Sequence, residues 1–143
     1  MKKEVEILVR AVIQDKEKIL VCEKVGKNYY FFPGGHLNFG ESTKKALIRE
    51  LKEELGLSIK ECSFIGGSEH RFIEDGKKHH EINLVFNVSA EKVKDKSLED
   101  HIDFVFLNNK EFKKEKVLPL ALQKNVIRWL KNKKIFWASQ KVK

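Results

Sequence analysis

Three glutamates stand within five residues of one another in the segment RELKEEL, which spans positions 49–55. In a helix with about 100° per residue, Glu54 lies about 40° and Glu53 about 60° from Glu50, on either side of it, so the carboxylates share one face. Carboxylates this close repel one another unless a cation lies among them, and Mg²⁺ and similar hard ions take oxygen ligands. The spacing therefore predicts a metal site of the kind that handles phosphate groups.

The other residues of this helix form an apolar stripe and a separate basic stripe. The two stripes consist of Leu47, Ile48, Leu51 and Leu55, and of Lys45, Arg49 and Lys52. A helix on a protein surface needs only an apolar face and a mixed polar face, so a third, acidic stripe indicates a function. By itself the segment also fits a solvated face with ion pairs between residues four apart.

The residues around the helix decide between these interpretations. The sequence has Gly35, then Glu41 after five residues, Arg49-Glu50-Leu51 after seven more, Glu53-Glu54 after one, and Gly56-Leu57 after one. This pattern resembles the Nudix box of the Nudix hydrolase family (MutT-like) at every specified position. Because about nine positions match at fixed spacing, and each residue type has an abundance of roughly 5–10%, a chance match is negligible.

The resemblance implies an α+β protein with the Nudix fold, an α/β/α sandwich with a mixed β-sheet between helices. It also implies an enzyme that uses Mg²⁺ or Mn²⁺ to hydrolyse a nucleoside diphosphate linked to another moiety. The box then covers residues 35–57 of a single domain that spans residues 1–143. The metal ligands implied at the matching positions are Gly34, through its carbonyl, Glu50, Glu53 and Glu54.

The supporting and proton-transferring residues follow from the same match. Arg49 is implied to orient a box carboxylate, and Glu41 to tie the loop to the helix. The general base is left open between Glu50 and Glu53, which together with Arg49 make up the expected catalytic residues. Glu99, farther along the chain, lies where family members have a further acidic metal ligand or base.

The sequence constrains the substrate less closely. The segment PGGHLNFGES resembles the start of the box in members that act on nucleoside triphosphates, so the leading hypothesis is a nucleoside triphosphate pyrophosphohydrolase that releases a nucleoside monophosphate. A net charge of +8 leaves open an RNA 5′-end pyrophosphohydrolase, because cations contact phosphates along a strand. A nucleotide-sensing module without hydrolysis is a third hypothesis, which the complete set of box carboxylates disfavours.

Four further residues are predicted to contact the substrate: Arg10, Tyr30, Phe32 and Gly35. Tyr30 and Phe32 belong to an aromatic run just upstream of the box, where a ring can stack on a base, although core packing explains such a run equally well. Arg10 lies on the strand face opposite Val9, where it reaches either a pocket or solvent.

Apolar periodicity predicts the elements that position these residues. We expect Pro33-Gly34-Gly35 to end a strand, Ser42 or Thr43 to cap the box helix, and Gly56 to end that helix. The predicted strands are 4–13, 18–23, 29–32, 62–73, 81–90 and 103–107, with a turn at 74–77, and the predicted helices are 43–55 and 120–132.

Composition fits one globular domain, with 41% apolar and 35% charged residues. Two cysteines without metal-type spacing favour a reducing compartment, the cytoplasm. No run approaches the ~20 apolar residues of a membrane span, which predicts no membrane partner. The basic tail from about residue 133 contains Phe136 and Trp137, which we expect to cover the core or to join a dimer, so a monomer and a homodimer both stay open.

Overall fold

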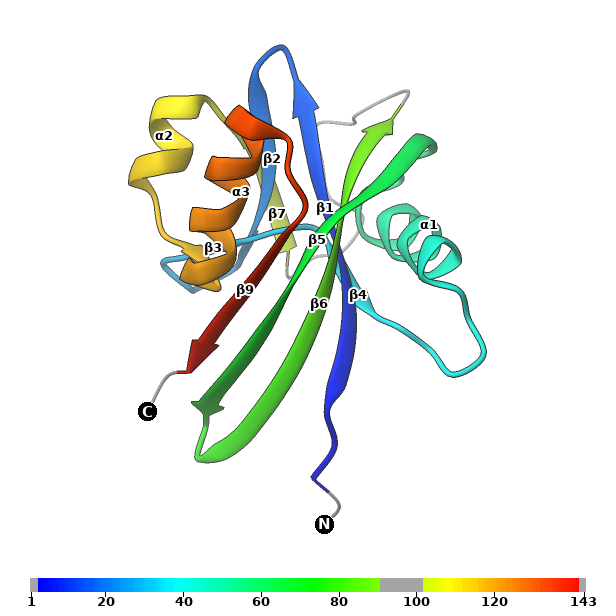
Figure 1. Cartoon of the computed structure of the whole chain (residues 1–143), viewed down its shortest axis with the longest axis vertical. Coiled ribbons are helices and arrows are strands. Elements are labelled where there is room, and N and C mark those ends of the chain that lie inside the picture. The colour runs from blue at the N-terminus through cyan, green and yellow to red at the C-terminus, as the bar shows by residue number, and fades with distance from the viewer. Residues whose placement is uncertain (1–2, 91–101, 142–143) are drawn as a thin grey trace.

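A curled mixed β-sheet with helices on both of its sides organises the chain (Figure 1). The computed structural model describes residues 3–90 and 102–141. The strands are β1 (Glu6–Asp15), β2 (Lys18–Lys24), β3 (Tyr30–Phe31), β4 (Gly34–His36), β5 (Ile59–Glu74), β6 (Lys77–Ala90), β7 (Ile102–Leu107), β8 (Val117–Leu118) and β9 (Phe136–Lys141). The helices are α1 (Thr43–Leu55), α2 (Asn109–Lys114) and α3 (Leu120–Asn132). The α+β class with a mixed sheet is therefore confirmed.

The strand order is β8-β3-β2-β1-β6-β5-β9, with β4 paired to β1 and β7 paired to β2. Strand β1 runs parallel to β6 and antiparallel to β4, so it joins the box strand to the long β5–β6 hairpin. The predicted turn of that hairpin is confirmed, because Asp75 and Gly76 have left-handed φ angles of 51° and 75°. Both strands of the hairpin are longer than predicted, because the ladder from Ile59 to Glu74 continues through polar residues.

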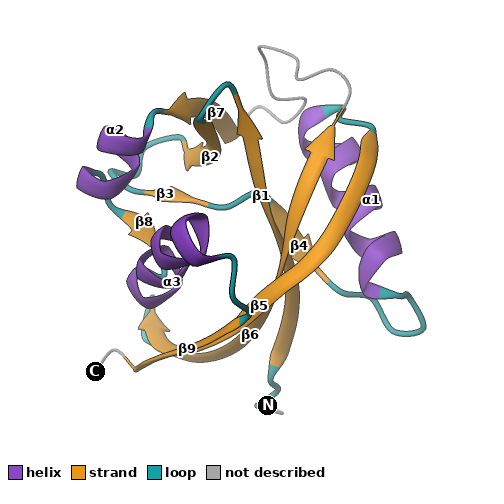
Figure 2. Ribbon diagram, turned by 45° about the horizontal axis from the view of Figure 1, so that its top comes forward, coloured by secondary structure: helices purple, strands orange, loops and turns teal. Residues whose placement is uncertain are grey.

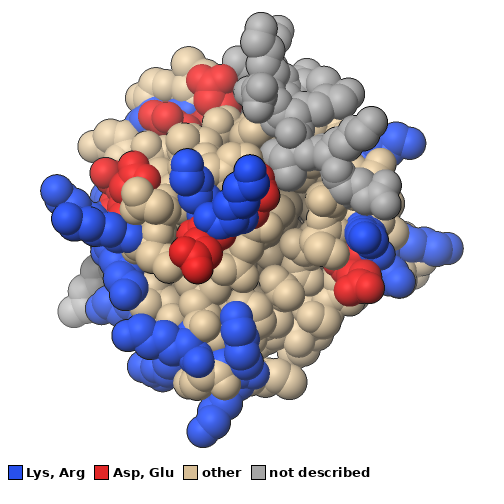
Figure 3. Space-filling view, turned by 90° about the horizontal axis from the view of Figure 1, so that it is seen from above, with Lys and Arg blue, Asp and Glu red and all other residues tan. Residues whose placement is uncertain are grey.

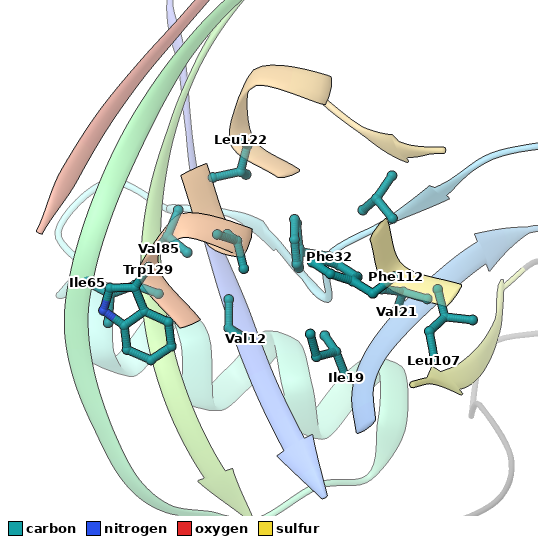
Figure 4. Packing of buried hydrophobic residues seen from close by; sticks show 12 residues of the cluster. Val12, Ile19, Val21, Phe32, Ile65, Val85, Leu107, Phe112, Leu122 and Trp129 are labelled. Atoms are coloured by element: carbon teal, nitrogen blue, oxygen red, sulfur yellow. The ribbon is translucent and has the colours of Figure 1, made fainter. Parts of the chain in front are cut away.

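Helix α1 lies on one side of the sheet, and helices α2 and α3 lie on the other (Figure 2). The α1 side is packed by Leu47, Leu51 and Leu55 against strand residues such as Val9. The core on the α3 side joins several elements, and Figure 4 shows its side chains converging. Its buried members are Val12, Ile19, Val21, Phe32, Ile65, Val85, Leu107, Phe112, Val117, Leu122, Val126 and Trp129.

The box helix begins and ends where the sequence predicts. The Ser42 hydroxyl accepts a hydrogen bond from the Lys45 amide at 3.1 Å, which satisfies one of the unpaired amides of the first turn. Gly56 ends the helix with a left-handed φ of 64°.

Three features differ from the sequence-based expectation. Gly34 and Gly35 were expected to end a strand, but they form β4, which pairs with β1. The short helix α2 and strand β8 were not predicted, because a single turn and a two-residue strand carry little periodicity. The tail contains β9, which adds to β5 in parallel from Phe136 to Lys141. A pairing between residues seventy positions apart leaves no local pattern.

Truncation after Asn132 is expected to lower the melting temperature markedly. It removes β9 together with the buried Ala138 and the partly buried Phe136, which packs against the α3-side core, and burial of apolar surface is the main stabilising term in folding. Thermal unfolding measures the effect, and size-exclusion chromatography of the same variant tests the dimer hypothesis. An unchanged melting temperature would contradict the packing role of the tail.

Candidate metal and hydrolysis site

The carboxylates of the α1 acidic stripe differ in their exposure. Glu54 is buried, with 6% of its surface exposed, whereas the Glu53 side chain is 56% exposed. The Glu50 carboxylate lies directly against Gly35, because a Cβ atom built at Gly35 would stand 2.4 Å from the Glu50 Cδ. Glu54 is thus buried, Glu50 lies against β4, and Glu53 faces solvent.

Arg49 connects the helix to the box loop. Its Nε and Nη2 donate to the two Glu41 oxygens at 2.8 and 3.0 Å, its Nη1 donates to Glu50 Oε1 at 2.8 Å, and its Nη2 also donates to the His36 carbonyl at 2.9 Å. The Glu53 carboxylate is 3.5 Å from Nη1. A planar guanidinium with a bidentate carboxylate partner is held in one orientation. The structure therefore brings Arg49, Glu41 and Glu50 together as the sequence implied.

The hydrogen bonds of this network shift the pKa values of its members. The side-chain hydrogen bond from Arg49 lowers the pKa of Glu41, and the bond to Glu41 is the largest cause that raises the pKa of Arg49. Because the folded-state pKa of Glu41 is depressed, the stabilisation is present above its ordinary pKa and is lost as the pH falls through the folded value. The loop therefore stays tied to the helix at neutral pH.

Gly34 occupies a position that only glycine can fill. Its φ is 144°, and a Cβ there would lie 1.9 Å from the Val9 carbonyl oxygen of the paired strand. The neighbouring Gly35 is register partner to Val9, and Gly34 to Arg10. Close pairing of β4 with β1 thus leaves no room for a side chain at Gly34, and the adjacent Gly35 lies against the Glu50 carboxylate of α1.

A metal site preformed from side chains alone is not present within residues 3–90 and 102–141, where no three His, Cys, Asp or Glu side chains converge closely enough to hold an ion. Mg²⁺ commonly uses only one or two carboxylates and completes its shell with water and substrate phosphates. The donors that the site offers are carboxylate oxygens and a glycine carbonyl, which fit a hard divalent cation. Glu99, the expected additional ligand, lies outside the described residues.

The predicted substrate-binding residues fall in different environments. Phe32 is 1% exposed and its ring packs edge-on against Phe112, with centroids 5.9 Å apart, so its place is in the core and base stacking by this ring is not supported. Tyr30 is half-buried and packs against the same core. Arg10 bonds to Asn83 Oδ1 at 3.1 Å and to the Phe32 carbonyl at 3.0 Å. Contacts of Arg10, Tyr30 and Gly35 with a substrate remain predictions.

Sequence reasoning missed two polar residues on the α3 side of the sheet. Asn83 and Ser68 are buried next to one another on β6 and β5. A signal was present, because Asn83 interrupts an apolar strand at the position two residues before the buried Val85. A polar residue at a core-facing position of a strand requires an explanation.

Comparison with known proteins defines the class of this fold and site. The sequence model of the NUDIX domain matches residues 3–130, so the chain belongs to the Nudix hydrolase family. Among curated relatives, it is 28% identical over 75 residues to the 8-oxo-dGTP diphosphatase of Proteus vulgaris, a match that covers 50% of this chain and 67% of that protein. It is 37% identical over 54 residues to the RNA pyrophosphohydrolase of Ruthia magnifica subsp. Calyptogena magnifica, covering 38% of this chain but only 30% of that protein.

Solved structures show the same fold. The MutT protein of Bacillus halodurans superposes with a TM-score of 0.79 at 18% identity, covering 95% of this chain and 89% of that one. The MutT protein of Methanosarcina mazei Go1 superposes with a TM-score of 0.72 at 23% identity, covering 94% and 99%. The predicted Nudix fold is thus confirmed. In the described part of the chain, no helix has the length and apolar character that a bilayer crossing requires.

Arg49→Lys is expected to lower turnover by about 10- to 100-fold, the range for residues that orient metal ligands. A lysine keeps the charge, but it cannot bind Glu41 through two donors and Glu50 through a third. The measurement is kcat and the Mg²⁺ concentration at half-maximal activity, with Lys52→Arg, an exposed residue of the same basic stripe of α1, as the control. Equal activity of the two variants would contradict an orienting role for Arg49.

Proposed function

We propose that this chain is a Mg²⁺- or Mn²⁺-dependent nucleoside triphosphate pyrophosphohydrolase that releases a nucleoside monophosphate. The observation that carries the proposal is the Arg49 network, which holds the Glu50 carboxylate against Gly35, the residue that follows Gly34 on β4. Packing of the helix on the sheet does not require an acidic side chain that is oriented toward the glycines of β4. The expected ligands are Gly34, Glu50, Glu53 and Glu54, with Glu99 as a further candidate.

A bound divalent cation would neutralise the diphosphate and lower the pKa of an attacking water. The residues of the chain then have distinct tasks. Arg49 and Glu41 fix the Glu50 carboxylate in place. Glu53, which is exposed and 3.5 Å from Arg49 Nη1, is assigned the task of accepting a proton from water at the reacting phosphorus, and Glu50 is the alternative base.

The leading substrate class rests on two supports. The box begins with PGGHLNFGES, which resembles members acting on nucleoside triphosphates. In addition, a relative matched over two-thirds of its own length is named an 8-oxo-dGTP diphosphatase. Free nucleotides in the cytoplasm are the corresponding substrates, and Cys22 and Cys62, which form no disulfide, fit a reducing compartment.

RNA 5′-end hydrolysis is the second candidate, because several relatives are named RNA pyrophosphohydrolases and the net charge is +8. A continuous basic track would favour it, because strand binding depends on successive phosphate contacts. Figure 3 shows lysines and arginines gathered in separate groups, with acidic residues among them, on the face it presents. On the described part of that face, the basic side chains do not form one continuous track.

A screen of nucleoside triphosphates, nucleoside diphosphate conjugates and 5′-triphosphorylated RNA, each with Mg²⁺ or Mn²⁺ and with product identification, tests the proposal. Release of pyrophosphate and a nucleoside monophosphate is the expected result. A preference for RNA that falls steeply with salt would favour the second candidate. Binding of nucleotides without turnover of any diphosphate compound would instead indicate a nucleotide-sensing module. Sizing in the same buffers distinguishes a monomer from a homodimer.

A further inference from the structure

Two neighbouring polar side chains lie buried in the middle of the sheet on its α3 side. Asn83 of β6 and Ser68 of β5 are register partners, and each is only 1% exposed. Alternate residues of a strand point to the same face, so Asn83 shares the face of Val85, which packs in the α3-side core. In a sheet that served packing alone, apolar side chains would fill these positions.

Each of the two side chains has a polar atom without a hydrogen-bond partner in the described part of the chain. These atoms are the Ser68 hydroxyl oxygen and the Asn83 amide nitrogen, Nδ2. A buried polar group left unsatisfied destabilises the fold, and such groups are rare in native proteins. Two unsatisfied polar groups next to one another indicate a ligand-binding function that is kept although it lowers the stability of the fold.

Arg10 fixes the direction in which the Asn83 amide points. The Arg10 Nε donates to Asn83 Oδ1 at 3.1 Å, and a guanidinium has donors but no acceptor. The amide oxygen must therefore face Arg10, and the NH₂ group must face away from it. Asn83 consequently offers a donor, not an acceptor, to any ligand that reaches it.

The same arginine connects the pair to the box. Arg10 Nη1 donates to the Phe32 carbonyl at 3.0 Å, two residues before Gly34. In the sheet, Arg10 is register partner of Gly34 on one side and of Val85 on the other. Adjacent strands are about 4.8 Å apart, so β4 and β6 are separated by roughly 10 Å. Strand β4 pairs with β1 alone in the described residues and forms an edge of the sheet there. A nucleotide whose phosphates lie at the box therefore has its base within reach of β6 when it passes over this edge to the α3 side.

Side chains on this face of β5 and β6 become more exposed toward the hairpin turn. We therefore infer that a ligand approaches the pair from that end. The next pair on this face is His70, 9% exposed, and the half-buried Glu81, and beyond it the Phe72 and His79 rings stack with centroids 4.9 Å apart. Burial raises the pKa of Glu81 and lowers that of His70, as expected in a region with little water.

We propose that Asn83 and Ser68 read the base of the nucleotide, with Asn83 Nδ2 donating to a carbonyl oxygen on the base edge and Arg10 acting as the positioning residue. This inference rests on the proposed nucleotide substrate. It makes bases with an exocyclic oxygen better substrates than bases with an amino group at the same position. An amino group would face the Asn83 amide donor to donor, and a site built for a hydrogen bond discriminates strongly against such a ligand.

The matched nucleotides ITP and ATP, and UTP and CTP, differ at this position by an oxygen or an amino group. We expect the wild-type chain to favour ITP and UTP in kcat/KM by at least about tenfold, the equivalent of one good hydrogen bond. Asn83→Asp keeps the oxygen that accepts from Arg10 but replaces the donor by an acceptor, so the preference should move toward ATP and CTP by a similar factor. Asn87→Asp, on the same strand, is the control.

Ser68→Ala separates base reading from a structural role. Because it removes a hydroxyl that has no partner in the described residues, the melting temperature should stay the same or rise while the base preference weakens; Ser139→Ala is its control. A lower melting temperature with an unchanged preference would mean that the pair holds only a buried water, and would overturn the inference.

Binding constants of IMP and AMP, measured by calorimetry, make the test independent of turnover. If no triphosphate is hydrolysed but IMP binds more tightly than AMP and Asn83→Asp reverses this order, the proposed activity fails and the base-reading pair stands. Equal affinity of wild-type protein for the two, or an unchanged order in Asn83→Asp, would overturn the pair whether or not hydrolysis occurs.

Discussion

Glu53→Gln is expected to lower turnover by ~10²–10⁴, the span for a positioned acid–base group. The substitution preserves the shape of the side chain but removes its capacity to take a proton from water or to bind a cation as a carboxylate. Glu53 is exposed on α1 and 3.5 Å from the Arg49 guanidinium, so its loss should disturb the fold little. The measurement is kcat with saturating Mg²⁺ on the best substrate of the screen.

Glu61→Gln is the matched control, because Glu61 is an exposed glutamate at the start of β5. The melting temperature of both variants should equal that of the wild type. Titration with Mg²⁺ and Mn²⁺ then separates the two possible roles of Glu53. A shifted metal requirement indicates a ligand, and a lower kcat at saturating metal indicates a base. Wild-type turnover by Glu53→Gln would remove Glu53 from the site and leave Glu50 as the candidate base.

Alanine substitution of the two glycines of β4 is expected to give the second large effect. The substitution should reduce mainly turnover at Gly35 and mainly stability at Gly34. Gly35→Ala should reduce turnover by about 10² or more, because a Cβ there stands 2.4 Å from the Glu50 carboxylate, and displacement of a catalytic group by about 1 Å can cost that factor. Its backbone has no left-handed φ, and the carboxylate is the mobile end of a side chain. Stability should therefore change little.

Gly34→Ala should instead destabilise the fold by about 3 kcal/mol or more, since strained backbone and a steric clash act together. Its φ of 144° disfavours any side chain, and its Cβ would meet the Val9 carbonyl at 1.9 Å, so β4 would have to part from β1. Chemical denaturation and kcat, measured on both variants, distinguish the positions. If Gly35→Ala lost stability but kept its turnover, the contact with Glu50 would have no functional meaning.

The sequence alone was sufficient for the local parts of this protein. The spacing from Gly35 to Leu57 predicted the family, and the family-model match over residues 3–130 confirmed it. Helix α1 has the predicted ends because capping by Ser42 and termination by Gly56 depend on neighbouring residues. The partnership of Arg49 with Glu41 and Glu50 was expected from the box, and the structure supplies its geometry.

Contacts between distant segments could be decided only by the tertiary structure. Strand β9 pairs with β5, and Gly34 acts as a strand residue because β1 lies beside it; neither pairing has a local sequence pattern. Phe32 was predicted to bind substrate, but its ring belongs to the core because α2 brings Phe112 against it. Asn83 and Ser68 become neighbours only when β5 and β6 pair. Residues that act together on one helix can therefore be predicted from their sequence spacing. The residues proposed to select the substrate come from several strands, and they become neighbours only in the folded chain.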